Sequence, residues 1–294
     1  MIVVLTAANS FLARQLGPLL VANGHTVRGT LRQPNQAKDL PWLQRFAAAD
    51  LAKPDVGDLF AGADAVLHLA HDFSADAADA NIAGTMSFFD QAANASVARQ
   101  VFVSSYSARA DAKSVYGKTK WTLEQQFRSH GAVIVRPGLV LGAGGIYARI
   151  VAAIAKFPVV PMLSGDGKIP FISIELLAQA VQAVLTQPQL PTLEFNLFAP
   201  ELATLSQLLI CSRDVLGVRT LLLPVPVGLV RAGLLTGGHL KLPLPVSVDN
   251  LDGFTGNQVQ VHHANMQLLG VQSESLRQAV ARSVGPKDKK SWAL

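Results

Sequence analysis

The chain has 294 residues, of which 50% are hydrophobic and 15% charged, so it is long enough for one large domain or for a domain with a smaller lobe. The formal net charge is +5, but the basic residues are scattered and the one dense run is KDKK at 287–290, which argues against nucleic-acid binding. The single Cys211 excludes an intramolecular disulfide, and no apolar run is long enough for a signal peptide or a membrane span. We therefore expect a cytoplasmic protein with neither nucleic acid nor a membrane as its partner.

The first half of the chain alternates short apolar runs with segments of helical periodicity. Apolar runs predict strands at 2–6, 25–31, 64–70, 99–105 and 132–138. Helical segments lie between them, beginning with 11–24, where leucines recur at helical spacing. Strands that are apolar on both faces and separated by helices predict a parallel sheet covered on both sides, which is a doubly wound α/β domain of the Rossmann type.

The pattern changes after residue 145. We expect the α/β domain to cover 1–145 with 169–198 returning to it, a smaller and mostly helical substrate lobe to cover 146–168 and 199–285, and a flexible tail at 286–294. The run TLLLPVPVGLVRAGLL at 220–235 is interpreted as core. Two alternatives stay open for this run: it lines a pocket for a hydrophobic carbonyl compound, or it forms a dimer face.

The stretch from 99 to 142 holds the residues with the clearest chemistry. Tyr116 and Lys120 are four apart on a predicted helix, so both side chains lie on one face. An ammonium beside a phenol favours the phenolate and lowers the pKa of the phenol toward neutrality, which makes it a usable proton donor and acceptor. Ser104 and Ser105 end a predicted strand at the edge where open α/β sheets bind ligands. A hydroxyl there can hydrogen-bond the substrate oxygen that Tyr116 protonates.

The order of these motifs resembles the short-chain dehydrogenase/reductase superfamily, in the extended or atypical branch that includes the NAD(P)-dependent epimerase/dehydratase proteins. The matching features are the opening strand-turn-helix, Asp50-Leu51, DAVLHLA, NIAGT, VFVSS, YGKTK and VIVRPGLVLG, followed by FISIELLAQAV. They run in family order from residue 1 to about 185, and the last third of the chain is less similar.

The resemblance implies a dinucleotide-binding domain with a hydride-transfer site. Tyr116 would be the acid/base, Lys120 would bind the nicotinamide ribose, and Ser105 would polarise the substrate oxygen. The implied cofactor contacts are Thr6, Ala8, Asn9, Ser10, Phe11, Leu12, Arg32, Asp50, Leu51, Leu69, Ala70, Ser104, Tyr116, Lys120, Pro137 and Gly138. Asp50 would accept from the adenine amino group, although a loop or helix-cap role stays open for it. Arg136 and Pro137 are expected to shape the strand end, and no metal site is expected.

The first turn departs from the family pattern. Relatives read T-G-A-T-G-F-I-G, whereas TAANSFLA here places Ala7, Ser10 and Ala13 at the three glycines. Ala7 fits the tight turn if its φ is negative, and Ala13 adds only a methyl group against the sheet. Free N–H groups at a helix N-terminus attract anions without glycine. We therefore expect the backbone of 9–12 to bind the pyrophosphate, with the Ser10 hydroxyl bonded to it or to a bridging water.

The cofactor preference is predicted from the end of the second strand. An NAD enzyme places an acidic side chain there, but this chain has Arg32, and a guanidinium suits a 2′-phosphate, so NADP is expected rather than NAD. We expect an NAD(P)-dependent oxidoreductase or epimerase/dehydratase that acts on a small molecule, either a nucleotide sugar or another carbonyl compound. The alternative is a non-catalytic dinucleotide-sensing or structural interaction protein. A homodimer stays open, as does the substrate-side geometry, because Ser173, Glu175 and Leu176 replace the usual His-Asp-Asp pattern.

Overall fold

The predicted strands form one parallel sheet in the computed structural model, which describes residues 1–74, 76–164, 167–239, 246–256 and 262–284. In spatial order the sheet contains β11 (Glu194–Leu197), β6 (Val133–Pro137), β5 (Arg99–Val103), β4 (Ala65–His68), β1 (Ile2–Leu5), β2 (Thr26–Leu31) and β3 (Arg45–Ala48). The strand order runs outward from β1 in both directions, through β2 on one side and β4 on the other. Ligands of doubly wound sheets bind at such a switch point, outside the carboxyl ends of the strands.

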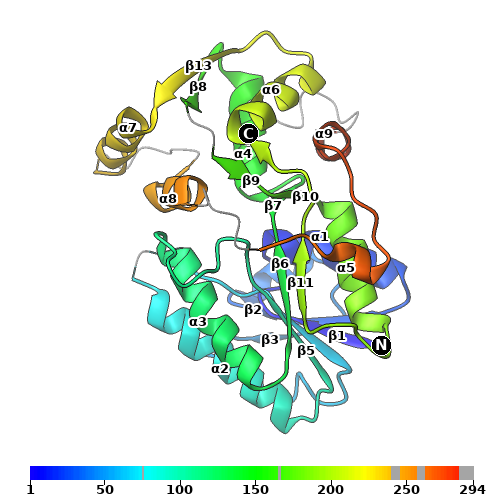
Figure 1. Ribbon diagram of the computed structural model, residues 1–294. Coiled ribbons are helices and arrows are strands. Elements are labelled where there is room, and N and C mark those ends of the chain that lie inside the picture. Colours follow the sequence, from blue (N-terminus) through cyan, green and yellow to red (C-terminus); the bar gives the residue numbers. More distant parts are fainter. Residues whose placement is uncertain (75, 165–166, 240–245, 257–261, 285–294) are drawn as a thin grey trace. The chain divides into compact units, whose positions relative to one another are not determined.

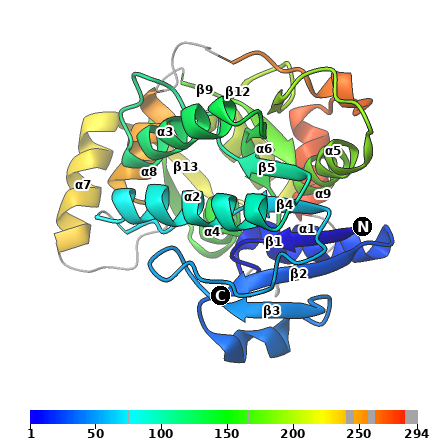
Figure 2. The same ribbon diagram turned by 90° about the horizontal axis from the view of Figure 1, so that it is seen from below.

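Helices cover both faces of this sheet. On one face lie α1 (Phe11–Ala22) and α5 (Ile174–Thr186), and on the other α2 (Ala78–Asn94) and α3 (Val115–Ser129) (Figures 1 and 2). Residues at odd and even positions of β5 contact opposite layers, because Phe102 stacks on Phe127 of α3 while Arg99 donates to the carbonyl oxygen of Val184 in α5. The predicted doubly wound α/β fold is confirmed.

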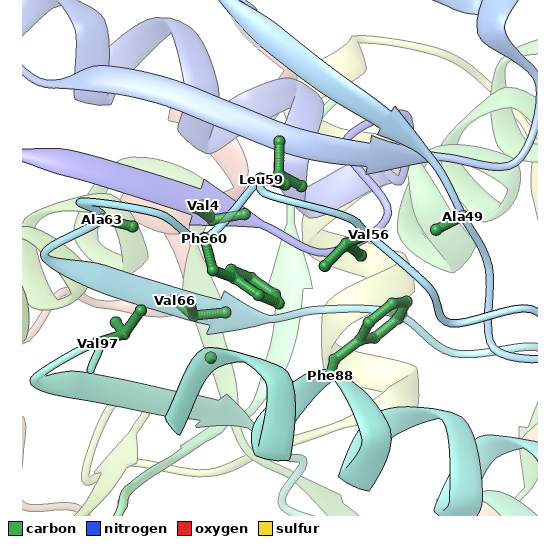
Figure 3. Close-up of a cluster of buried hydrophobic side chains, with 11 residues drawn as sticks. Val4, Ala49, Val56, Leu59, Phe60, Ala63, Val66, Phe88 and Val97 are labelled. Atoms are coloured by element: carbon green, nitrogen blue, oxygen red, sulfur yellow. The ribbon is translucent and has the colours of Figure 1, made fainter. Parts of the chain in front are cut away.

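An apolar cluster fills the space between the sheet and α2 (Figure 3). Val4 of β1 and Val66 of β4 point from the sheet into the cluster, and Phe88 enters it from α2. Phe60, from the segment between β3 and β4, completes the cluster. A parallel sheet buried on both faces requires apolar residues at consecutive positions, and this is why β1 reads Ile-Val-Val-Leu.

The chain divides into two compact units. Unit 1 comprises Met1–Ala110, Val115–Arg136 and Ala178–Phe195, and unit 2 comprises Asp111–Ser114, Pro137–Leu177 and Asn196–Leu294. Residues 137–145 and 169–177, which we expected with the first domain, thus belong to unit 2. The reason is that β7 (Leu139–Leu141) pairs with β10 (Phe171–Ser173) instead of joining the large sheet.

Unit 2 combines helices with short strand pairs. Besides β7 and β10, its strands pair as β9 (Lys168–Ile169) with β12 (Ala203–Thr204) and β8 (Val159–Ser164) with β13 (Leu221–Pro226). Its helices are α4 (Gly145–Lys156), α6 (Leu205–Leu216), α7 (Val227–His239), α8 (Val248–Gly256) and α9 (Leu276–Val284). Tyr147 of α4 is buried in the core with Leu208 and Ala279, and its hydroxyl bonds the Ser212 hydroxyl at 3.1 Å. The predicted tail at 286–294 lies outside the described residues.

Candidate cofactor and catalytic site

The turn between β1 and α1 has the backbone shape of a glycine loop without a glycine. Ala7 has a φ of 56°, in the left-handed region, so it occupies the turn without the negative φ that the sequence analysis set as the condition for an alanine there. The N–H of Ala7 donates to Thr30 Oγ1 at 2.9 Å, and the N–H of Ala8 donates to the Thr30 carbonyl oxygen at 2.8 Å. These two bonds to β2 hold a conformation that costs an alanine about 1 kcal/mol.

The space that this turn requires comes from the neighbouring strand. Ala8 is fully buried against Leu31 and Leu40. A Cβ on Gly29 of β2 would lie 2.7 Å from the Ala8 Cβ and 2.8 Å from the Leu5 carbonyl oxygen. A side chain at position 29 would therefore push the turn away from the sheet, so Gly29 provides the room for a turn that has no glycine of its own.

The N-terminus of α1 is open to an anion. Ser10 is the N-cap, and its Oγ accepts a hydrogen bond from the Ala13 N–H at 3.3 Å. Within the residues that the structure describes, the N–H groups of Asn9, Phe11 and Leu12 have no hydrogen-bond partner. The Ser10 oxygen thus caps the helix and keeps its own proton to donate, and three backbone donors and the positive end of the helix dipole stay available.

Replacing Ala7 with glycine is expected to raise the free energy of unfolding by about 0.5–1 kcal/mol. Glycine removes the penalty of about 1–2 kcal/mol that a left-handed alanine carries. It also raises the conformational entropy of the unfolded chain, which lowers the stability by a smaller amount. Urea unfolding of both proteins measures the difference. Ala8→Gly is the matched control, because Ala8 is fully buried and is not among the residues with positive φ, so this variant should be less stable than the wild type. A stability of Ala7→Gly below that of the wild type would contradict the assignment.

The ends of β1 and β4 are joined by a buried hydroxyl. Thr6 Oγ1 accepts hydrogen bonds from the N–H groups of Leu69 and Ala70 at 2.8 and 3.0 Å. Beyond them, the Asn81 side chain bonds both the N–H and the carbonyl oxygen of Asp72 at 2.8 Å each. Thr6, Leu69 and Ala70 are therefore brought together as predicted, and the segment after β4 is fixed by α2.

Asp50 and Leu51 follow β3. Asp50 Oδ1 accepts hydrogen bonds from the N–H groups of Ala52 and Lys53 at 2.9 and 2.8 Å, which is the loop role that the sequence left open. A Cβ on Gly84 of α2 would lie 2.2 Å from the Leu51 carbonyl oxygen. The glycine of the NIAGT motif thus lets α2 pass close to the backbone of this loop.

Arg32 follows β2 and is largely exposed. Its Nη1 lies 3.9 Å from Asp72 Oδ2, and such an exposed pair contributes little to stability. Hydrogen bonds from Ser74, more than the charge of Arg32, hold the pKa of Asp72 below its usual range. The guanidinium is therefore held only loosely and can turn to another anion.

Tyr116 and Lys120 lie on one face of α3, as their spacing predicts. Lys120 is buried, and its Nζ donates to the Val103 carbonyl oxygen at 2.8 Å and lies 5.8 Å from the centre of the Tyr116 ring. Burial lowers the pKa of Lys120 to about 8, opposed by the charge of Glu124. The side chain is thus still mostly an ammonium at neutral pH, and in the described part of the chain only one of its three protons has a partner.

Two aromatic residues that the sequence analysis missed surround Tyr116. The rings of His71 and Phe73 each contact the Tyr116 ring, with centroids 4.8 and 5.6 Å away. Burial, and then the charge of Lys120, lower the pKa of His71 to about 3, so its imidazole is neutral at physiological pH. Both residues directly follow the predicted strand DAVLHLA, and their place at the carboxyl end of a strand was the signal that could have identified them.

The two serines after β5 have different partners. Ser104 Oγ donates to Glu124 Oε1 at 2.5 Å, so this hydroxyl is engaged with α3. Ser105 Oγ accepts from the Ser107 N–H at 3.2 Å and keeps its own proton to donate. The structure therefore favours Ser105 over Ser104 as the hydroxyl for a substrate oxygen.

A buried ion pair that the sequence analysis missed stands behind Lys120. Both oxygens of Glu124 accept from Arg136, with Nε and Nη2 at 2.8 and 2.7 Å, and both side chains are buried. Arg136 also bonds Glu194 at 2.7 Å, and hydrogen bonds from Arg128 and Arg136 lower the pKa of Glu194 to about 2. Glu124 continues the series of Tyr116 and Lys120 at four-residue intervals, which was the available signal.

The predicted residues of unit 2 have local roles in their strands. A Cβ on Gly138 would lie 2.6 Å from the Pro170 carbonyl oxygen, so this glycine allows β7 and β10 to approach. Ser173 Oγ accepts from the Leu176 N–H at 3.3 Å, and the Ser173 N–H donates to Glu274 at 2.7 Å. Ser173 thus joins the start of α5 to the segment before α9.

Comparisons with known proteins agree with this geometry. Residues 7–133 match a family model described as NAD(P)H-binding. The ceramide reductase of Caulobacter vibrioides is 28% identical over 260 residues, which cover 85% of this chain and 82% of that protein.

Solved structures share the fold along the chain. UDP-glucose 4-epimerase from Bifidobacterium longum, in complex with NAD+ and UDP, has a TM-score of 0.72 at 15% identity, with 100% of both chains covered. A human epimerase family protein with NADPH has a TM-score of 0.70 at 19% identity, with 96% of this chain and 99% of that chain covered. The comparisons thus agree with the resemblance seen in the sequence: residues 7–133 match an NAD(P)H-binding family, and the chain has the fold of solved epimerase family proteins.

Proposed function

We propose that the protein is an NADP(H)-dependent oxidoreductase that reduces a carbonyl compound, with Tyr116 as the acid. The observation that carries this proposal is the pairing of Tyr116 with a buried, charged Lys120 on one face of α3. Burying an ammonium is costly, and here the cost is offset by the hydrogen bond to Val103, by the Phe102 ring, whose centre lies 4.7 Å from Nζ, and by the charge of Glu124. The relative that covers most of the chain is named as a reductase, which supports reduction as the direction.

The mechanism assigns one role to each polar group. Ser105 Oγ, which keeps its proton, donates a hydrogen bond to the substrate carbonyl oxygen. Tyr116 Oη donates the proton that converts this oxygen to a hydroxyl, and the Lys120 ammonium stabilises the phenolate that is left. A nicotinamide cofactor held at Lys120 and the N-terminus of α1 would supply the hydride for the carbonyl carbon. Neutral His71 packs against the Tyr116 ring and limits the access of water.

The residues at the ends of β1 to β4 fit a dinucleotide. The open N–H groups of Asn9, Phe11 and Leu12 suit the pyrophosphate. Two unused protons of Lys120 suit ribose hydroxyls. The remaining contacts of unit 1 that the resemblance implies, namely Thr6, Ala8, Asp50, Leu51, Leu69 and Ala70, are proposed to line the same site through backbone and apolar surface.

Titration of the purified protein with NADPH and with NADH, followed by nucleotide fluorescence, tests the proposal. We expect saturable binding of NADPH, and then NADPH oxidation with one member of a panel of long-chain ketones, aromatic aldehydes and nucleotide sugars. Binding of neither nucleotide at millimolar concentration would overturn the proposal. Binding of NADPH with no turnover on any class of carbonyl compound would favour the alternative of a dinucleotide-sensing protein.

Arg32→Asp is expected to raise the Kd for NADPH by at least about tenfold and to leave the Kd for NADH unchanged or lower. The guanidinium provides the charge-assisted bonds to a 2′-phosphate, whereas a carboxylate repels that phosphate and accepts from a 2′-hydroxyl. Fluorescence titration with both nucleotides measures the ratio. Arg45→Asp is the control, since Arg45 begins β3 at the opposite end of the sheet and pairs with Asp58 there. Equal losses for both nucleotides would remove Arg32 from the choice of cofactor.

A further inference from the structure

The pair of strands β8 and β13 in unit 2 has one buried and one exposed apolar face. Val160 and Leu222 point inward and pack with Ile154 of α4. Their neighbours point outward: Val159 is 47% exposed and Leu221 58% exposed, and the two are paired in register. A strand of a solvated sheet usually alternates apolar with polar residues, but here the outward positions are apolar as well.

The outward residues form a continuous set. Leu223, 49% exposed, follows Leu221 on the same face of β13, and Phe157, 51% exposed, precedes Val159. We call Phe157, Val159, Leu221 and Leu223 the outer apolar face. The chain continues from β13 directly into α7, where Leu229 is 65% exposed. The interpretation of 220–235 as core is thus wrong, because alternate residues of β13 and much of α7 face away from the core.

The two segments of the chain that form this face carry charges of one sign. The sequence has no aspartate or glutamate from 125 to 165 or from 215 to 248, and the pairing of β8 with β13 brings these two segments together. Lys156 and Arg219 are exposed just before β8 and β13, and the strands are parallel, so both cations lie at the same end of the pair. The Lys156 Nζ lies 5.8 Å from the centre of the Phe157 ring.

We propose that the outer apolar face docks on the surface of an anionic lipid bilayer. Apolar side chains gain from entering the boundary between headgroups and acyl chains, and lysine and arginine beside them gain from lipid phosphates and carboxylates. In the described residues no helix is long and apolar enough to cross a membrane, so the contact is one with the surface. The proposal goes beyond the proposed reduction, and it replaces the sequence-based expectation of no membrane partner.

The same charges argue against a second copy of the chain as the occupant. A copy seated on this face would bring another Lys156 and Arg219 with it, and the two acid-free segments offer no carboxylate for them. Like charges placed together across an interface are unfavourable. An anionic bilayer has the opposite charge over its whole surface and needs no particular partner residue.

Cosedimentation of the full chain with vesicles tests the proposal. We expect binding to vesicles of phosphatidylcholine with phosphatidylglycerol, weaker binding to phosphatidylcholine alone, and a loss of binding as salt rises. Leu221→Glu/Leu223→Glu should reduce the bound fraction at least fivefold, and Lys156→Gln/Arg219→Gln should reduce it on anionic vesicles only. Leu19→Glu/Val21→Glu, which places two glutamates at exposed apolar positions of α1, is the matched control and should bind as the wild type does.

NADPH titration and thermal unfolding show that each variant is folded, and both readouts are independent of turnover. Absence of wild-type binding to anionic vesicles overturns the proposal. Equal binding by the wild type and Leu221→Glu/Leu223→Glu overturns it too. Sedimentation velocity tests a second copy of the chain as the occupant. If the wild type is a dimer that does not bind vesicles, and Leu221→Glu/Leu223→Glu is a monomer, the face belongs to a dimer interface and the proposal is overturned.

Discussion

Tyr116→Phe is expected to lower turnover by at least about 100-fold while leaving the Kd for NADPH within about twofold. General acid catalysis by a positioned side chain contributes about 10²–10⁴ to a rate, and phenylalanine keeps the ring while removing the proton donor. The ring contacts with His71 and Phe73 do not require the hydroxyl, so the packing of α3 should persist. Steady-state NADPH oxidation and fluorescence titration measure the two effects separately.

Tyr147→Phe is the matched control for this change. Tyr147 is buried in unit 2, where its hydroxyl bonds Ser212, so the variant loses the same atom at a place with no proposed role in catalysis. We expect it to cost about 1 kcal/mol of stability and little turnover. Retention of more than a tenth of wild-type turnover by Tyr116→Phe would remove Tyr116 from the mechanism. Loss of NADPH binding would instead indicate a structural role for its hydroxyl.

The large sheet could be predicted because its cause is local in the sequence. Runs such as IVVL are apolar at every position, and only a strand buried on both faces needs that. Tyr116 and Lys120 were equally accessible, since four residues on a helix bring two side chains to one face and the structure keeps them there. In both cases neighbouring positions in the chain carry the information.

The features that could not be predicted depend on contacts between distant segments. The left-handed Ala7 is held by Thr30, and the room for its turn comes from Gly29, more than 20 residues away. The exposure of one face of β13 could not be predicted from the sequence for a related reason. An apolar run gives no sign of which alternate residues are covered, because that depends on where β8 and α4 lie.

Arg136→Met is expected to lower the free energy of unfolding by about 3–5 kcal/mol, the largest effect on stability that we predict. Arg136 supplies two of the hydrogen bonds to Glu124, and without it a fully buried carboxylate keeps Ser104 as its near partner, with Arg128 at 3.9 Å. Leaving one member of a buried pair unpaired costs that much because desolvation is no longer compensated. Urea unfolding at pH 8 measures the loss.

The double variant Glu124→Leu/Arg136→Met separates the charge from the packing. Removing both partners leaves no buried charge, so most of the lost stability should return even though the ion pair is gone. A double variant as unstable as Arg136→Met would show that the arginine acts through its packing. Recovery in the double variant would show that Arg136 stabilises the fold by pairing with the buried Glu124, the side chain one turn beyond Lys120 on α3.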